Sequence, residues 1–348
     1  MADPEIRIDQ LTGTRVLIAS GRALRPDQFS RSSRQPNGAK GCPFCEGQEG
    51  QTPPEIDADR PGDSAPDGPG WQTRTVPNLY PAVVPEPEGG CAGDDTAGAF
   101  ASSADPLLAS ARSTEPDMFA SRPGYGAHEV VVNSPKHAAS LGELDQAEMA
   151  LAVAAWRRRM KAHDDSAYVQ LILNQGSDSG ASIEHSHAQI GAMQFVPAAV
   201  ARERERFNSY RERTAGASLL GEVLREEIRR GDRLVAIDDE VALICPWASR
   251  FPFEMRIIPR RPQPSFENGD GGATMLGRAV AALTDLFGEP PQLNLWVKTA
   301  PRGAEHFHWH LDLIPRLEPA SAFEMATGVN INITSPESAA ESLRESIA

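Results

Sequence analysis

The strongest fold signal in this chain is SIEHSHAQIGAMQFVP, residues 182–197. Its apolar residues and the alternation around the histidines predict a β-strand. On a strand, His185, His187 and Gln189 point to the same face because they are spaced by two. A row of three polar side chains cannot face the core, so this face of the strand is predicted to carry chemistry.

The segments around this strand occur twice along the chain, in the same order. The shared pattern is a strand, a helix, a strand with an Asn, and a strand that contains H-x-H and ends in Pro. This ordered set of matches predicts an internal duplication. In the first half the segments are HEVVVNSP (128–135), a helix over 144–162, YVQLILNQ (168–175) and the histidine strand, and in the second half they are FEMRIIP (253–259), a helix over 275–286, QLNLWVKT (292–299) and HFHWHLDLIP (306–315).

The chain is therefore predicted to be an α+β protein with two similar halves, over residues 1–197 and 198–348. Strands outnumber helices and have hairpin-like spacing, which indicates antiparallel sheets. A single charged helix is expected over 199–230. Residues 85–123, rich in Gly, Ala, Ser, Asp and Pro, are predicted to be a flexible insertion in the first half.

Composition limits the function classes. The formal net charge of -14 argues against nucleic acid and anionic membranes as partners, because it repels their phosphates. No apolar stretch approaches the roughly 18 residues that span a bilayer, and the first residues lack the pattern of a signal peptide. The four cysteines, of which Cys42 and Cys45 form a C-x-x-C, fit a reducing compartment better than a disulfide framework. The chain is expected to be cytoplasmic.

The H-x-H-x-Q pattern suits covalent chemistry at phosphorus. A neutral imidazole near pH 7 has a free lone pair and is a competent nucleophile, since its unperturbed pKa is about 6.5. A nearby Gln can donate a hydrogen bond to a phosphoryl oxygen without offering an acidic proton. The pattern therefore predicts a nucleotidyl-histidine, and surface histidines without a role are the alternative.

The second-half segment HFHWH allows more than one interpretation. Its histidines, His306, His308 and His310, would also share a face on a strand. They could form a metal site, form a phosphate site, or remain on an inherited strand without chemistry. We favour a substrate-side or structural role, and a second metal near His308 and His310 stays an open alternative.

HSHAQI (185–190) is similar to the H-P-H-x-Q-[IV] signature of galactose-1-phosphate uridylyltransferases. These enzymes are a branch of the histidine-triad superfamily in which Gln replaces the last His of the triad. Further segments resemble the same family in the same order, and they leave out mainly the 85–123 insertion. They are LTGTRVLIASGRALRP (11–26), GCPFCEGQEGQTPPE (41–55), VPNLYPAV (76–83), HEVVVNSPKHAASLGEL (128–144), NQGSDSGASIEHSHAQI (174–190), HFHWHLDLIPRL (306–317) and FEMATGVNINITSPESAAESLR (323–344).

The resemblance implies a fold, an activity and partners. The fold would be two tandem histidine-triad-like halves that form one pseudo-symmetric unit. The activity would be transfer of UMP from UDP-glucose to galactose 1-phosphate, with His187 as the nucleophile and Gln189 beside the transferred phosphoryl group. The ligands would thus be a nucleoside diphosphate sugar and a hexose 1-phosphate, and the family suggests a homodimer.

The resemblance also implies a structural zinc site. The family's ligands are the C-x-x-C, the His of S-P-x-H and the first His of H-x-H, which correspond to Cys42, Cys45, His137 and His185. Two thiolates and two imidazoles make a complete tetrahedral set, so no position is left for substrate. A redox C-x-x-C is the alternative, but no thioredoxin-like βαβ pattern surrounds this pair.

The resemblance assigns substrate-binding residues from several segments. Two arginines would lie near the phosphates and two asparagines near the nucleotide. Ser182 and Gln189 would surround the transferred phosphoryl group, and Glu324 would accept hydrogen bonds from the hexose. Fixed guanidinium donors match phosphate oxygens and offset the acidic net charge. The residues are Arg22, Arg25, Asn78, Asn174, Ser182, Gln189 and Glu324.

Several residues depart from the family pattern. Ser186 stands where uridylyltransferases usually have Pro, Ala181 where many have Cys, and Phe323 where Tyr is common. HFHWH followed by DLIPR resembles the ADP-glucose phosphorylase branch, which uses adenine nucleotides and inorganic phosphate. An adenylyl-transferring enzyme is therefore the first alternative, and a non-catalytic, zinc-stabilised nucleotide-binding protein is the second.

Overall fold

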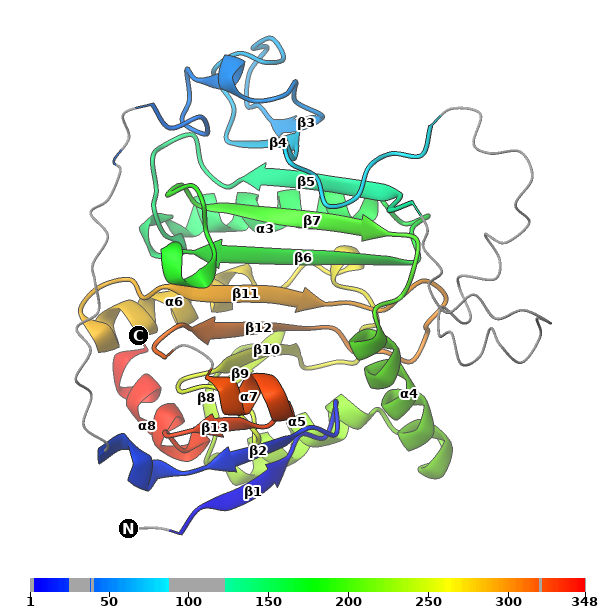
Figure 1. The fold of residues 1–348 in the computed structure, drawn as a ribbon, viewed down its shortest axis with the longest axis vertical. Helices are drawn as coiled ribbons and strands as arrows, with labels where there is room; N and C mark the ends of the chain where they lie inside the picture. Colours follow the sequence, from blue (N-terminus) through cyan, green and yellow to red (C-terminus); the bar gives the residue numbers. More distant parts are fainter. Residues whose placement is uncertain (1–2, 25–37, 39–40, 88–122, 319–320, 348) are drawn as a thin grey trace, which may run out of the picture.

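A computed structural model describes residues 3–24, 38, 41–87, 123–318 and 321–347. Within these residues the strands form one large and one small sheet (Figure 1). The large sheet contains β3 (Asp57–Asp59), β4 (Thr73–Pro77), β5 (Gly126–Val132), β6 (Tyr168–Gln175), β7 (His187–Met193), β8 (Leu234–Ile237), β9 (Val241–Ile244), β10 (Met255–Pro259), β11 (Leu293–Lys298) and β12 (His310–Pro315). The small sheet contains β1 (Glu5–Ile8), β2 (Arg15–Ile18) and β13 (Asn330–Asn332).

Helices connect and cover the strands. The α-helices within the described residues are α3 (Gln146–Lys161), α4 (Ala198–Arg213), α5 (Leu219–Arg230), α6 (Ala273–Phe287), α7 (Ala322–Thr327) and α8 (Pro336–Ser346). Short 3-10 turns are η1 (Ser20–Leu24), η2 (Glu49–Gln51), η3 (Leu141–Glu143), η4 (Ser177–Ser179) and η5 (Phe266–Asn268). Among the described residues, no helix combines the length and apolar character needed to cross a bilayer.

The large sheet has two matching halves. Its order is β3-β4-β5-β7-β6-β11-β12-β10-β9-β8, and every neighbouring pair is antiparallel. The order outward from β6 therefore repeats outward from β11, and these two strands join the halves through pairs such as Asn174 with Asn294. The predicted α+β class with antiparallel sheets is confirmed. The 197/198 boundary falls between β7 and α4 and stays a prediction.

Both histidine strands begin later than the sequence predicts. They begin at His187 and His310, so His185, His306 and His308 precede them. The backbone just before β7 pairs with the loop after β5 instead of with a neighbouring strand, which explains the late start. His306 is exposed whereas His308 and His310 are buried, so the expectation that these three share one face is wrong.

The prediction of a single charged helix over 199–230 is also wrong. The region forms two helices, α4 and α5, because the chain turns between Arg213 and Leu219. Gly216, with φ at 116°, adopts a backbone conformation that side chains disfavour, and this conformation cannot continue a helix. Most of the predicted 85–123 insertion lies outside the described residues.

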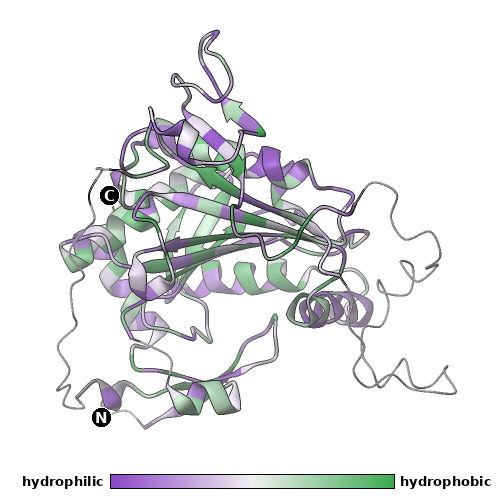
Figure 2. Ribbon diagram, turned by 45° about the horizontal axis from the view of Figure 1, so that its top comes forward, coloured by the Kyte–Doolittle hydropathy of each residue, from purple (hydrophilic) through white to green (hydrophobic). Residues whose placement is uncertain are grey.

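The two faces of the large sheet have different roles. Helices α3, α6 and α8 pack on one face, and the apolar residues of β7, Ala188, Ile190 and Ala192, join their core. Since side chains alternate along a strand, His187 and Gln189 point to the opposite face. In Figure 1, α4, α7 and the small sheet lie over this face in the C-terminal half, whereas loops and the short turn η4 cross the β5-β7-β6 region. In Figure 2, hydrophobic colouring is strong in the large sheet, whereas α4 is largely hydrophilic.

Candidate active site

Two cysteines and two histidines converge beside the start of β7. Cys42 Sγ lies 3.5 Å from His185 Nδ1, and Cys45 Sγ lies 3.4 Å from His137 Nδ1. All four ligand atoms lie within 4.8 Å of one another. A tetrahedral metal with ordinary bond lengths would separate S and N ligands by about 3.5 Å. The predicted ligands are therefore brought together in a group that could hold one metal ion.

The surroundings of this group also fit a metal. His185 Nε2 lies 2.8 Å from the Ser134 carbonyl and donates to it, which turns Nδ1 toward the cysteines. Desolvation and the neighbouring Cys42 raise the pKa of the Cys45 thiol to about 11. A bound cation would reverse this effect, since it holds its thiol ligands as thiolates.

A buried hydrogen-bond chain fixes the backbone between the two histidines of H-x-H. Trp156 Nε1 donates to Asn133 Oδ1 at 2.8 Å, and Asn133 Nδ2 donates to Ser186 Oγ at 2.9 Å. The Asn133 N–H also donates to the Ser186 carbonyl. Sequence patterns did not indicate Asn133 or Trp156, because their role depends on a contact between β5, α3 and the turn before β7.

His187 has one committed ring nitrogen and one free ring nitrogen. Its Nδ1 lies 2.6 Å from the His185 carbonyl and must donate to it. Nε2 therefore carries the lone pair, and it has no hydrogen-bond partner among the described residues. The ring is buried, 5.1 Å from the Phe44 ring centroid, and desolvation lowers the pKa of His187 although the His185 carbonyl opposes the shift. The imidazole is thus held neutral, with a nucleophilic nitrogen available.

Gln189 lies in a small polar cluster on the same face as His187. Asn78 Nδ2 lies 3.4 Å from Gln189 Oε1, so two predicted site residues meet here. His128 Nε2 lies 3.0 Å from the same oxygen. His128 begins the HEVVVNSP segment, but nothing in its sequence context marked it as a site residue.

The other residues predicted near the nucleotide lie around the turn before β7. Asn174 stands one residue beyond the Leu173–Ala188 pair of β6 and β7, which places it opposite His187. Its Oδ1 accepts from Asn294 Nδ2 at 2.8 Å. Ser182 is exposed in the same turn. The roles assigned to these side chains remain predictions.

Arg22 and Glu324 lie together, apart from this cluster. The hydrogen bond from Ser321 is the main cause that lowers the pKa of Glu324 in α7, and the positive charge of Arg22, which lies in η1, contributes to the same shift. No contact joins either residue to His187 within the described residues. In Figure 1, α7 lies over the C-terminal half, whereas β7 belongs to the other half. Arg25 lies outside the described residues.

The second half repeats the histidine geometry. His308 Nε2 donates to the Pro259 carbonyl at 2.9 Å, as His185 does to a carbonyl after β5. His310 Nδ1 lies 3.4 Å from the His308 carbonyl oxygen, and the equivalent distance from His187 Nδ1 to the His185 carbonyl oxygen is 2.6 Å. His310 is therefore the structural counterpart of His187.

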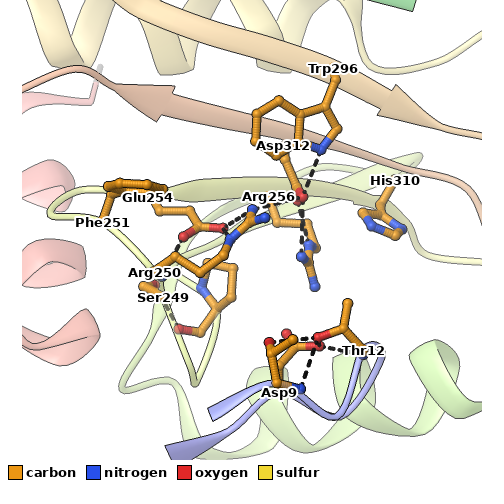
Figure 3. A network of polar contacts seen from close by, with 12 residues as sticks. Asp9, Thr12, Ser249, Arg250, Phe251, Glu254, Arg256, Trp296, His310 and Asp312 are labelled. Atoms are coloured by element: carbon orange, nitrogen blue, oxygen red, sulfur yellow. Dashed lines mark hydrogen bonds and ion pairs between the residues drawn. The ribbon is translucent and has the colours of Figure 1, made fainter. Parts of the chain in front are cut away.

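The space in front of His310 is filled by protein side chains. Glu203 Oε1 from α4 lies 3.6 Å from His310 Nε2. The Asp312 carboxylate, two residues after this histidine, accepts hydrogen bonds from Arg256 Nε at 2.6 Å and from Trp296 Nε1 at 3.1 Å. Figure 3 shows this network beside His310. The counterpart site thus holds an internal cation and carboxylate where a substrate would have to bind.

The second-metal alternative gains no support from this network. Within the described part of the chain, the only group of three or more metal-ligating side chains is the Cys42, Cys45, His137 and His185 group. The arrangement around His308 and His310 instead favours the structural role among the interpretations that the sequence left open.

Known proteins match the chain in sequence. The sequence model described as galactose-1-phosphate uridyl transferase, N-terminal domain, matches residues 100–197. ADP-glucose phosphorylase of Arabidopsis thaliana is 30% identical over 364 residues, which cover 98% of this chain and 93% of that protein. Galactose-1-phosphate uridylyltransferase of Thermotoga maritima is 25% identical over 359 residues, 98% of each chain.

Solved structures match as well. A crystal structure of ADP-glucose phosphorylase from Arabidopsis thaliana with bound ADP-glucose has a TM-score of 0.75 and 27% identity, and the match covers 99% of both chains. A uridylyltransferase structure at 23% identity, with a TM-score of 0.69, shares the fold. The buried cysteine and histidine group, the H-x-H-x-Q strand and these near-complete matches show that the chain belongs to the galactose-1-phosphate uridylyltransferase family of nucleotidyltransferases, with similarity to its ADP-glucose phosphorylase branch.

Proposed function

We propose that this protein transfers a nucleotide from a nucleoside diphosphate hexose through a covalent nucleotidyl-His187 intermediate. The observation that carries the proposal is the hydrogen bond from His187 Nδ1 to the His185 carbonyl, because it leaves the Nε2 lone pair free. The desolvation that lowers the pKa of His187 also keeps the ring in its nucleophilic form at neutral pH.

The reaction has two in-line steps. Nε2 of His187 attacks the α-phosphorus, the bond to the bridging oxygen breaks, and hexose 1-phosphate leaves. The acceptor's phosphate oxygen then attacks the same phosphorus, and the N–P bond breaks to restore the neutral imidazole. Gln189 donates a hydrogen bond to a phosphoryl oxygen in both steps, so positioning and charge stabilisation supply most of the acceleration.

Among the donors, we favour ADP-glucose with inorganic phosphate as acceptor, which would give ADP and glucose 1-phosphate. The Arabidopsis thaliana relative of this name, at 30% identity over almost the whole chain, supports this choice. Ser186, which stands where the uridylyltransferase signature has Pro, agrees with it. The second candidate is transfer of UMP from UDP-glucose to galactose 1-phosphate, supported by the relatives named galactose-1-phosphate uridylyltransferase.

We further propose that the metal is zinc and that its role is structural. Two thiols and two imidazoles are a donor set typical of closed zinc sites. Because Cys42, Cys45, His137 and His185 would fill a tetrahedral coordination shell, the metal would hold the turn before His187 and take no part in the transfer.

Trapping the intermediate tests the proposal. The protein is incubated with ADP-glucose or UDP-glucose, each labelled at the α-phosphorus, and the acid-labile protein-bound label is counted. We expect one of the two donors to label the protein in stoichiometric amount. The acceptor of the second step, inorganic phosphate or galactose 1-phosphate, should release this label. The variant His187→Asn should carry no label. Nucleotide binding without label would instead favour the non-catalytic alternative, and label in His187→Asn would refute the role of this histidine.

We also propose a homodimer, in which a second copy supplies the Arg22 and Glu324 region to the His187 site. The separation of these residues from His187 within one chain supports the proposal. If it holds, mixing inactive His187→Asn with inactive Glu324→Gln should restore up to about a quarter of the activity, by random pairing of subunits. A monomer in solution, or a mixture as inactive as its components, would contradict it.

A further inference from the structure

Two backbone N–H groups fix the polar cluster around Gln189. The Ala82 N–H donates to His128 Nδ1 at 3.0 Å, and the Tyr80 N–H donates to Asn78 Oδ1 at 2.9 Å. A backbone amide can only donate, so both acceptors are set without ambiguity. His128 must therefore carry its proton on Nε2, and Asn78 must turn its Nδ2 amide group away from Tyr80.

The N–H donors of His128 and Asn78 both face the same atom, Gln189 Oε1. His128 Nε2 lies 3.0 Å from this oxygen and Asn78 Nδ2 lies 3.4 Å from it. The 3.3 Å contact between His128 Nε2 and Asn78 Nδ2 joins two donors, so it is not a hydrogen bond but a result of their shared acceptor. The end of the Gln189 amide that faces His128 must therefore be the oxygen.

The strand register shows where the other end of the amide points. His128 on β5 pairs with Gly191 on β7, whereas Gln189 pairs with Val130 and His187 with Val132. His128 thus lies beyond Gln189 on the side away from His187. With its oxygen held on that side, the Gln189 amide turns its Nε2 group away from His128, and this group has no partner among the described residues.

We propose that His128 is a positioning residue that locks the Gln189 amide with its N–H groups toward the phosphoryl group transferred by His187. The inference rests on the proposed nucleotidyl transfer. A flipped amide would present its oxygen to the phosphoryl oxygens and repel them, so an unlocked Gln189 would spend part of its time in an unproductive orientation. His128 prevents this flip because its Nε2–H would then face an N–H group.

Nuclear magnetic resonance tests the lock without any substrate. Long-range proton–nitrogen correlation of the histidine rings in the intact protein distinguishes the two neutral tautomers. We expect His128 to carry its proton on Nε2, with Nδ1 as the acceptor. The opposite tautomer would overturn the proposal whatever the activity of the protein.

A double-mutant cycle tests the consequence for catalysis. The rate of nucleotidyl-His187 formation is measured in single turnovers for His128→Phe, Gln189→Ala and the double variant. We expect His128→Phe to slow this step by about tenfold or more with little change in half-saturating donor concentration, since it acts on one transition-state donor. The double variant should be no slower than Gln189→Ala, because His128 acts only through that side chain.

Matched variants complete the experiment. His163→Phe replaces another partly buried histidine, one that contacts Glu129, and should leave the rate of adduct formation unchanged. His128→Gln, which can present an amide N–H in place of Nε2, should recover part of the rate and serves if His128→Phe fails to fold. Additive losses in the double variant, or an unchanged rate in His128→Phe, would overturn the inference. Failure of the native protein to form any adduct would instead reject the proposed transfer itself.

Discussion

Ser186 occupies the position between the two histidines where the family signature has Pro. Proline would stiffen this backbone through its ring, whereas Ser186 is tied by Asn133 and, through it, by the Trp156 indole. All three side chains are buried. A hydrogen-bond chain therefore replaces a covalent restraint just before the nucleophile.

Removing the Ser186 hydroxyl should reveal this restraint. Ser186→Ala leaves the buried Asn133 Nδ2 group without an acceptor, so we expect it to lower the free energy of unfolding by about 1–3 kcal/mol. Urea unfolding measures the change. Ser182→Ala, an exposed serine in the same turn, is the control and should unfold like the native protein. Equal free energies of unfolding for the two variants would contradict a stabilising role for the hydrogen bonds that link Ser186, Asn133 and Trp156.

Glu203 should make stability depend on pH. Desolvation raises the pKa of Glu203 to about 7 from an ordinary value of 4.5, although Lys298 and Arg256 oppose the shift. Because the folded-state pKa lies above the unfolded one, the stabilising contribution is fully present below pH 4.5 and is lost as pH rises through 7. The loss should reach about 3 kcal/mol at higher pH.

Unfolding free energies measured between pH 4.5 and 8 check this expectation. Glu203→Gln keeps the side-chain shape but cannot titrate, so its stability should lose this part of the pH dependence. A variant with the same slope as the native protein would show that another group is responsible.

At the scale of the elements, the β5–β7 pair carries the site. β5 holds His128 and β7 holds His187 and Gln189, so the register of this one ladder sets the distances between them. The ladder begins at Gly126, where a Cβ atom would lie 2.0 Å from the Ala192 carbonyl oxygen of β7. Glycine is therefore required at this position by close approach of the two backbones.

Gly126→Ala should open this end of the ladder. The clash is with backbone, which cannot rotate away, so we expect a loss of roughly 1–3 kcal/mol in the free energy of unfolding. Thermal and urea unfolding measure it. Gly191→Ala on the facing strand is the control, since a Cβ there would meet no atom within 4 Å. A stable Gly126→Ala protein with native hydrogen exchange in β5 and β7 would refute the argument.

In the molecule as a whole, the group of Cys42, Cys45, His137 and His185 connects the segment over residues 41–48 to the turns that follow β5 and precede β7. Cys42 and Cys45 come from that segment, whereas His137 follows β5 and His185 precedes β7. A small apolar cluster that includes Phe44 and Trp71, and the Glu46 N–H that donates to the Pro135 carbonyl, hold this segment as well, so a metal would add to contacts that the protein already makes.

Metal analysis should find one zinc ion per chain. Cys42→Ser should lose it and fall in stability by roughly 2 kcal/mol or more, since a structural zinc contributes folding energy directly. Activity should fall as well, because His185 would bind the metal and its carbonyl accepts the hydrogen bond that orients the His187 ring. Cys245→Ala, which removes a buried cysteine outside the group, should keep its zinc. An unchanged metal content in Cys42→Ser would contradict the assignment.

Much of the site was accessible from the sequence because it is carried by short patterns. The C-x-x-C, the S-P-x-H and the H-x-H-x-Q were enough to name His187 and the four candidate metal ligands, which lie together in the structure. The predicted site residue Asn78 contacts Gln189. His128 could not be found this way, since its role depends on a backbone amide 46 residues away in the chain. The helix break near Gly216 was missed because a charged, periodic stretch resembles one helix on either side of the turn.

Chain order and spacing by two are local properties, so the sequence was enough to predict an α+β fold with antiparallel sheets and the shared face of His187 and Gln189. The three-dimensional packing, in contrast, sets which of the two H-x-H copies keeps a ring nitrogen without a partner among the described residues. His310 repeats the ring geometry of His187, but Glu203 and the Arg256–Asp312 pair fill the space before it. Solvent access and charge compensation at His310 depend on side chains from α4 and β10, which no pattern around His310 reveals.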